Sequence, residues 1–337
     1  MKIMNSDRIV VAGAGAVGCF VGGLLAASGR PVTLLGRASI LDPIAANGLA
    51  LTDFSGLDAQ IAAESLTLSE NPECLRDAGV ILVSVKTPGS PKMAIAIGAN
   101  AAPEVPVVSL QNGMDAVAAL ESGLPGRRVL PSVVGFNVVQ RGPARFHRAT
   151  GGELLLPRSA EALELDVAGL EVRFVDDIVA HQWGKLLLNL TNALNALSGL
   201  TIREQLLSRP WRGLLADQMA EGLAVLRKAG KPVQSGTPLP PGAIPGLLRL
   251  PTPLFRVIAA RMLAVDAEAR TSMVRDFEAG RPTEVDSLQG ALVRLGKAQG
   301  VPTPICSAVL NLVRSGEGQQ APRRYSVAEI RKKVKAG

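Results

Sequence analysis

The stretch RIVVAGAGAVGCFVGGLLAASGRPVTLLGR, residues 8–37, decides the fold of this chain of 337 residues. It holds an apolar run at 8–12, the pattern G-x-G-x-x-G at 13–18, a segment of small residues, and a second apolar run at 32–35. This order predicts a strand, a tight turn, a helix and a second strand. The amino-terminal end of such a helix attracts phosphate. The stretch therefore predicts a dinucleotide-binding βαβ unit.

Each glycine of the turn has its own predicted role. Gly13 permits the tight turn, Gly15 lets the backbone approach a pyrophosphate, and Gly18 lets the helix pack closely against the strand. The alternative is a glycine-rich apolar turn without a ligand, which the strand–helix–strand setting disfavours. The predicted cofactor-binding loop consists of Gly13, Ala14, Gly15, Ala16, Val17 and Gly18.

The end of the second strand indicates which dinucleotide binds. An NAD site has Asp or Glu here, where the carboxylate bonds the ribose 2′-hydroxyl. This chain has Gly36 and Arg37 instead, and its nearest acid, Asp42, lies several residues into the following loop. A guanidinium can pair with a 2′-phosphate, so NADP(H) is the predicted cofactor. A surface arginine that only closes the strand is the alternative.

The uncharged run from Ile9 to Ser28 imitates a signal peptide or a membrane span. Its glycines disfavour a stable apolar helix. A parallel strand buried on both faces, followed by its packed helix, explains the run better. No other stretch approaches membrane-spanning length, so we expect a soluble, cytoplasmic protein that does not associate with membranes.

Composition narrows the remaining function classes. Hydrophobic residues form 47% of the chain, enough for two domains with their own cores. The cysteines lie far apart and there are only two histidines, so neither a disulfide framework nor a metal site is predicted. Aromatic residues form 3%, too few for base-stacking platforms, and much of the net charge of +7 lies near the C-terminus. Nucleic acid is therefore not an expected partner.

The character of the chain changes near residue 178. Before it, strand-like runs recur with helical or loop material between them, as in a parallel doubly wound sheet. The runs after the βαβ unit are 80–85, 105–110, 128–139, 152–156 and 172–175. Beyond it, helical spacing dominates, over 181–197, 211–229, 252–277, 283–299 and 304–314. The predicted fold is α/β, with a Rossmann-type doubly wound sheet followed by an all-helical domain.

Three parts follow from this division. Residues 1–177 are predicted as the NADP-binding domain, 178–320 as the helical substrate and catalytic domain, and 321–337 as a solvated basic tail. The stretch 231–253 contains seven prolines and three glycines, which predicts a long surface loop or lid.

Polar residues follow two of the strand-like runs. Lys86 comes directly after 80–85, and Asn112 follows 105–110. Ligands of doubly wound sheets bind beyond the carboxyl ends of the strands, so both side chains are predicted near the nicotinamide ribose. The alternatives are an exposed lysine and an Asn-Gly turn.

The segment HQWGKLLLNLTN, residues 181–192, places a lysine among leucines. Lys185, Asn189 and Asn192 follow helical spacing and are predicted on one face. Loss of water around the ammonium disfavours its charged form and suits Lys185 to donate a proton to a new alkoxide. The alternative is a lysine that reaches out to water beside two structural amides.

A second polar cluster lies in the last quarter of the chain. A helix break is predicted at 280–282, and Thr283 with Asp286 resembles a capping box that starts the next helix. Glu284 would then lie in the first turn, where the helix dipole favours a carboxylate. In a functional interpretation, Glu284 accepts a hydrogen bond from a substrate hydroxyl and Ser272 donates one to a substrate carboxylate.

Together these features resemble the ketopantoate reductases (2-dehydropantoate 2-reductases) over nearly the whole chain. That resemblance implies a Rossmann domain and a helical domain with the active site in the cleft between them. It implies that Lys185 is the general acid and that Glu284 is the second catalytic residue and binds the substrate. The motifs that carry it are Gly13 to Gly18 with Arg37, Lys86, Asn112-Gly113-Met114, Trp183-x-Lys185-x-x-x-Asn189, and Ser272 twelve residues before Glu284.

The resemblance also assigns the remaining contacts. Lys86 and Asn112 would flank cofactor and substrate, and Asn189 and Ser272 would bind the substrate. The family places a further asparagine four residues after the one that matches Asn189. This chain has Ala193 there and Asn192 one position earlier, so Asn192 is the candidate in its place.

The sequence therefore predicts NADPH-dependent reduction of 2-dehydropantoate to (R)-pantoate, a precursor of pantothenate, with the proton supplied by Lys185. One alternative is reduction of another branched 2-oxoacid. Another is a non-catalytic NADP-binding sensor, which would require neither Lys185 nor Glu284. The expected partner is a small 2-oxoacid, and a homodimer is compatible with the sequence.

Overall fold

The computed structural model describes residues 7–236, 239–263 and 270–336. It divides into two compact units between Ile178 and Val179. The first unit contains the strands, and the regular elements described in the second are helices, apart from one short 3-10 turn. The predicted fold class is thus confirmed.

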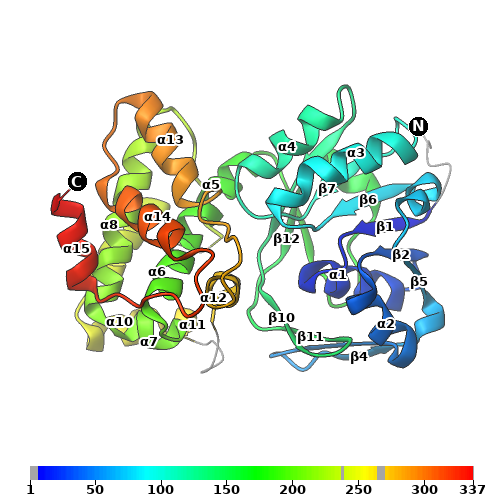
Figure 1. Ribbon diagram of the computed structural model, residues 1–337, viewed down its shortest axis with the longest axis horizontal. Coiled ribbons are helices and arrows are strands. Elements are labelled where there is room, and N and C mark those ends of the chain that lie inside the picture. Colours follow the sequence, from blue (N-terminus) through cyan, green and yellow to red (C-terminus); the bar gives the residue numbers. More distant parts are fainter. Residues whose placement is uncertain (1–6, 237–238, 264–269, 337) are drawn as a thin grey trace. The chain divides into compact units, whose positions relative to one another are not determined.

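A parallel sheet lies at the centre of the first unit (Figure 1). Its six strands run in the order β5-β2-β1-β6-β7-β8, and each neighbouring pair is parallel. This is the strand order of a doubly wound dinucleotide-binding sheet. The strands are β1 (Ile9–Ala12), β2 (Val32–Leu35), β5 (Leu66–Ser69), β6 (Val80–Val83), β7 (Val107–Ser109) and β8 (Val129–Pro131).

Alternate residues of β1 enter two different apolar cores. Ile9 and Val11 pack with α1 (Ala16–Ala27), whereas Val10 and Ala12 belong to the core that includes α3 (Ser90–Asn100) and α4 (Asp115–Gly123). Figure 1 shows these helices on opposite faces of the sheet. Because both faces are covered, every residue of β1 is apolar and buried. This explains the uncharged run of the sequence.

Two smaller sheets complete the first unit. One has the order β10-β11-β3-β4 and the other β13-β12-β9. Their strands are β3 (Leu49–Asp53), β4 (Asp58–Ile61), β9 (Val133–Val134), β10 (Val138–Gly142), β11 (Arg145–Arg148), β12 (Leu154–Pro157) and β13 (Val172–Val175). The predicted run 128–139 is therefore divided among β8, β9 and the start of β10. Helix α2 (Ala38–Asn47) follows β2, and short 3-10 turns lie at 63–65, 72–77, 87–89 and 158–163.

The second unit is built from helices of very different length. The longest, α8 (Arg209–Lys228), has 20 residues, and several others have fewer than eight. None of the described helices is long and apolar enough to span a membrane. Besides α8 and a 3-10 turn at 241–243, the elements are α5 (Ile178–Asn189), α6 (Thr191–Ser198), α7 (Ile202–Leu207), α9 (Ile244–Arg249), α10 (Thr252–Ile258), α11 (Ala260–Leu263), α12 (Ser272–Glu278), α13 (Gln289–Gln299), α14 (Pro304–Gly316) and α15 (Val327–Ala336).

Two long predicted helices are wrong as single elements. The segment 181–197 forms α5 and α6, with Leu190 between them. The segment 252–277 contains α10, α11 and most of α12, and its residues 264–269 lie outside the described part of the chain. Helical spacing continued through both, so periodicity alone did not mark the breaks.

The proline-rich stretch 231–253 is a surface loop only in its first half, where the described residues are mostly exposed, and its second half is packed. Within it, α9 buries Ile244 and Leu248. Arg212 of α8 is 1% exposed and donates hydrogen bonds to the carbonyl oxygens of Leu248 at 3.0 Å and Leu250 at 2.8 Å. Because the buried guanidinium of α8 donates to these backbone carbonyls, it holds residues 248–250 against α8.

The prediction of a solvated C-terminal tail is wrong. The backbone N–H of Tyr325 donates to the carbonyl of Leu197 at 2.9 Å, and Ile330 of α15 is fully buried. Arg331 pairs with Asp217 of α8 at 2.6 Å. The basic charges of this segment therefore accompany an amphipathic helix that packs on the second unit, which a count of charges did not reveal.

Candidate active site

Two glycines of the turn between β1 and α1, Gly13 and Gly18, have no room for a side chain. Gly13 has φ +119°, and a Cβ there would lie 2.7 Å from the backbone nitrogen of Val85. A Cβ on Gly18 would lie 2.2 Å from the carbonyl oxygen of Gly13. The hydroxyl of Ser84, at the end of β6, donates to that same oxygen at 2.5 Å. The turn is thus held against the neighbouring strand end as a preformed loop.

The start of α1 is open to a ligand. Gly15 is its N-cap, and within the described residues no side chain caps this end of the helix. A Cβ on Gly15 would meet only the carbonyl oxygen of Ser84, at 4.0 Å. Uncapped N–H groups and the positive end of a helix of 12 residues fit the phosphates of a dinucleotide.

Arg37 lies where the ribose of such a dinucleotide would be recognised. It is exposed and is the N-cap residue of α2, two positions after β2. In the part of the chain that the structure describes, its guanidinium has no hydrogen bond or ion pair within the protein. The carboxylate of Glu70, directly after β5, accepts a hydrogen bond from the N–H of Ala38 at 3.0 Å. Sequence reasoning missed this carboxylate because β5 was not predicted.

The loops after β6 and β7 lie together. The Thr87 hydroxyl donates to the Asn112 carbonyl at 3.4 Å, and the buried Gln111 amide donates to the Val85 carbonyl and to Ser90 Oγ, both at 2.7 Å. Lys86 is exposed and Asn112 is partly buried. The structure therefore brings the two predicted strand-end residues onto neighbouring loops. Gln111, which joins these loops, was not singled out from the sequence.

Lys185 lies on α5, directly before two buried leucines. Leu186 and Leu187 are 2% and 1% exposed, and the lysine itself is partly buried. Burial lowers the pKa of Lys185 from 10.5 to about 8, while the negative charge of Glu284 opposes this shift. An ammonium with a pKa near neutrality is an effective proton donor. The structure thus brings Lys185 and Glu284 into electrostatic contact, although they are far apart in the sequence.

Part of the proline-rich stretch lies directly on α5. The backbone N–H of Gln234 donates to the carbonyl of Ala180 at 3.0 Å. A Cβ on Gly184 would lie 1.9 Å from the carbonyl oxygen of Gln234. The residue next to Lys185 must therefore be glycine for the stretch to approach so closely.

The predicted capping box at Thr283 is wrong. The N–H and hydroxyl of Thr283 donate to Glu317 at 2.8 and 2.7 Å, and Asp286 pairs with Arg314. Helix α13 begins only at Gln289. Arg314 of α14 and Glu317, which directly follows that helix, therefore bind the residues of the expected cap. Glu284 is not in the first turn of a helix, so the helix dipole does not explain its presence.

The joint between α5 and α6 separates the predicted asparagines. Lys185 and Asn189 share α5, whereas Asn192 belongs to α6. Gln289 of α13, fully buried, donates through Nε2 to the carbonyl of Leu190 at 3.0 Å and to Gln218 Oε1 at 3.2 Å. This amide holds the joint, and it was not singled out because a glutamine among apolar residues gives no specific signal.

Ser272 is the first residue of α12 and is partly buried. The N–H of the preceding Thr271 donates to Asn195 Oδ1 at 3.0 Å. Ser272, Lys185, Asn189, Asn192 and Glu284 all belong to the second unit, whereas the glycine turn, Arg37, Lys86 and Asn112 belong to the first. The candidate residues thus divide into two groups, one in each unit.

Family models match both units of the chain. Residues 9–161 match the model described as ketopantoate reductase PanE/ApbA, and residues 177–317 match the model described as ketopantoate reductase PanE/ApbA C terminal. The 2-dehydropantoate 2-reductase of Halobacterium salinarum is 28% identical over 318 residues, which cover 91% of this chain and 98% of that protein.

Solved structures are similar over the same length. The PanE/ApbA family ketopantoate reductase from Ralstonia eutropha JMP134 has 29% identity and a TM-score of 0.78, covering 93% of this chain and 99% of that one. D-mandelate dehydrogenase, in a ternary structure with NADH and anilino(oxo)acetate, has 22% identity and a TM-score of 0.74, covering 92% and 98%. The latter likeness concerns the fold alone.

Proposed function

Because the chain belongs to the ketopantoate reductase family, we propose that it catalyses the NADPH-dependent reduction of 2-dehydropantoate to (R)-pantoate, a step toward pantothenate. The family makes it an oxidoreductase with a nicotinamide cofactor. The observation that carries the finer proposal is the partly buried Lys185, whose pKa is about 8 and which interacts with Glu284. A protein that only bound a dinucleotide would need neither charge.

The proposed chemistry needs one proton at one oxygen. NADPH, when bound, supplies the hydride that adds to the ketone carbon. The ammonium of Lys185 stabilises the negative charge that develops on the ketone oxygen and then transfers a proton to it, which gives the alcohol and a neutral amine. Solvent reprotonates the amine before the next turnover.

The neighbouring polar residues would orient the substrate. We assign substrate binding to Asn189, Asn192 and Ser272, with Ser272 donating to the substrate carboxylate. Glu284 accepts a hydrogen bond from the 4-hydroxyl group, the feature that separates 2-dehydropantoate from simpler 2-oxoacids. Its position outside any helix start supports this role over a structural one. Such positioning lowers the barrier because the reacting atoms are held in register.

The choice of NADP(H) over NAD(H) rests on Arg37. This exposed guanidinium has no partner within the described residues and follows β2, where an NAD site would have a carboxylate. Lys86 and Asn112 lie on loops beyond β6 and β7 and are proposed to contact the nicotinamide ribose.

Reduction of another branched 2-oxoacid is the second candidate. The fold is shared with a D-mandelate dehydrogenase structure, so the fold alone does not select the substrate. The Ala193-Leu194 pair, where the family has a further asparagine, is the sequence feature that favours this candidate. Both residues are fully buried, so they offer no replacement for that amide.

The experiment that tests the proposal is NADPH oxidation by the purified protein across a panel of 2-oxoacids. We expect the highest kcat/KM with 2-dehydropantoate and a lower value with 2-oxo-3,3-dimethylbutanoate, which lacks the hydroxyl. A higher value with another 2-oxoacid would replace the substrate and keep the reaction. Absence of turnover with every member, despite NADPH binding, would favour the sensor.

We also propose that the enzyme acts in the cytoplasm, where both NADPH and a 2-oxoacid are available. Light scattering of the purified protein tests the compatible homodimer, since a dimer has twice the mass of the 35.1 kDa chain.

A further inference from the structure

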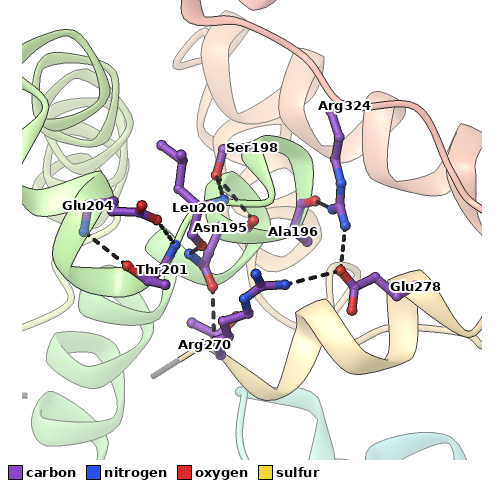
Figure 2. A network of polar contacts seen from close by, with 10 residues as sticks. Asn195, Ala196, Ser198, Leu200, Thr201, Glu204, Arg270, Glu278 and Arg324 are labelled. Carbon is purple, nitrogen blue, oxygen red and sulfur yellow. Dashed lines mark hydrogen bonds and ion pairs between the residues drawn. The ribbon is translucent and has the colours of Figure 1, made fainter. Parts of the chain in front are cut away.

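One buried side chain of α6 connects several segments of the second unit. Asn195 is fully buried, and its Oδ1 accepts the Thr271 N–H at 3.0 Å. Its Nδ2 donates to the Leu200 carbonyl at 2.6 Å and to Gln205 Oε1 at 3.2 Å. Figure 2 shows this amide at the centre of a network of polar contacts. Its acceptor and its donor group are both used, which only an amide side chain allows here.

The hydrogen bond to Thr271 fixes the start of α12. Thr271 is the N-cap of this helix, but its side chain makes no capping bond, and its buried Oγ1 has no hydrogen-bond partner among the described residues. The start of the helix is therefore held by Asn195 rather than by its own N-cap side chain. The next residue is Ser272, the proposed ligand of the substrate carboxylate.

The other end of α12 is also connected to α6, through Arg324. Glu278, its last residue, accepts hydrogen bonds from Arg324 at 2.5 Å and from Arg270 at 3.4 Å. Arg324 also donates to the carbonyl of Ala196, the neighbour of Asn195 (Figure 2). A helix of seven residues has little stability by itself. Both of its ends are thus tied to residues 195–196 of α6.

We propose that Asn195 is a positioning residue for Ser272: by holding the Thr271 amide, it keeps the Ser272 hydroxyl where it binds the substrate carboxylate. This inference rests on the proposed function. Arg324, which comes from the segment before α15, secures the far end of the same helix. The C-terminal segment thereby takes part in substrate binding without touching the substrate.

Steady-state kinetics of Asn195→Ala test the proposal. If Ser272 is displaced, its proposed hydrogen bond to the substrate carboxylate is lost. Loss of a hydrogen bond to a charged group corresponds to roughly tenfold weaker binding or more. We expect KM for the 2-oxoacid to rise about tenfold, kcat to change much less, and the Kd for NADPH to stay the same. In a Ser272→Ala background, Asn195→Ala should add less than about a further twofold, because both changes remove one interaction.

Ser198→Ala is the matched control. The Ser198 hydroxyl donates to the Asn195 carbonyl at 3.2 Å and accepts from the Leu200 N–H at 3.2 Å, and neither hydrogen bond involves α12. Its loss removes polar contacts from the same turn but keeps the hydrogen bond of Asn195 to the Thr271 N–H, so KM should stay unchanged. Unchanged KM in Asn195→Ala, or an effect that adds fully to that of Ser272→Ala, would overturn the proposal.

Two further measurements keep the test decisive. Amide hydrogen exchange of the segment 271–278 in the free protein should be faster in Asn195→Ala than in Ser198→Ala. This measurement needs no turnover. It therefore tests whether Asn195 holds the start of α12, even if the proposed reaction is wrong. If Asn195→Ala does not fold, Arg324→Met is the second variant. It removes the hydrogen bonds by which Arg324 joins Glu278, at the other end of α12, to Ala196. Arg324→Met should also raise KM for the 2-oxoacid. An unchanged KM in this variant would contradict the proposal that α12 positions Ser272.

Discussion

Two glycines next to the proposed sites, one in each unit, differ in the space that surrounds them. A Cβ on Gly15 would meet one atom, at 4.0 Å, whereas a Cβ on Gly184 would lie 1.9 Å from the carbonyl oxygen of Gln234. The first glycine leaves space for a ligand, and the second leaves space for the chain's own backbone. The proposed nucleotide site is therefore an open loop, whereas the helix that carries Lys185 is covered by another segment.

The charged residues of the two regions also differ in their exposure to water. Arg37 is exposed, where water screens its charge, so it is suited to recognise a phosphate that arrives from solution. Lys185 is partly buried among leucines, where desolvation lowers its pKa to about 8. We therefore propose that the first region selects the cofactor and that the second sets the pKa of the proton donor. Variants in the two regions should accordingly affect different measurable quantities.

The largest effect is expected from Lys185→Ala. Loss of a positioned proton donor typically lowers kcat by about 10²–10⁴. The Kd for NADPH, measured by quenching of protein fluorescence, should remain within about twofold because the nucleotide site belongs to the other unit. Lys228→Ala, an exposed lysine on α8, is the control and should keep wild-type kcat. Near-normal turnover of Lys185→Ala would remove the general acid from the mechanism.

The next effect concerns cofactor choice. Arg37→Ala should weaken NADPH binding by roughly 1.5–3 kcal/mol, the contribution of a hydrogen bond to a charged group, and should change NADH binding little. Calorimetric titration with each cofactor measures both values. Arg76→Ala, which removes an exposed arginine paired with Glu73 in the same unit, serves as the control. An equal loss for NADPH and NADH would show that Arg37 does not bind the 2′-phosphate.

The sequence predicted the nucleotide-binding unit well for a local reason. The turn, its helix and β2 are contiguous, and each residue type there is required by backbone geometry or by burial on both faces of the sheet. The strands β3, β4 and β11 were missed because their sheet joins distant segments. Short strands of this kind are stabilised by their partners rather than by a recognisable run of their own.

The second unit was harder to predict because its decisive contacts are not local. The cap expected at Thr283 is replaced by Glu317, more than thirty residues away in the chain. The C-terminal basic residues are recruited by Asp217 and Glu278. Asn195 and Gln289 gave no signal, since a buried amide is recognised only when its partners are known. The lysine among leucines was the one feature of this unit with a local signature.

A smaller effect is expected from Glu284→Gln on substrate preference. A charged acceptor is about twice as strong as a neutral one, so the preference for 2-dehydropantoate over 2-oxo-3,3-dimethylbutanoate should fall roughly tenfold. The ratio of the two kcat/KM values measures this preference and cancels any general loss of activity. If both values fall in parallel, Glu284 acts only on Lys185 and does not contact the substrate hydroxyl.

The pH dependence of kcat tests the coupling of Lys185 and Glu284 most directly. The donor must be protonated, so kcat of the wild type should fall as pH rises through about 8, the pKa of Lys185. Glu284 raises that pKa, so in Glu284→Gln the same fall should occur at lower pH. A wild-type kcat that stays constant from about pH 7 to 9.5, or a profile that Glu284→Gln leaves in place, would contradict a proton donor tuned by burial and by this carboxylate.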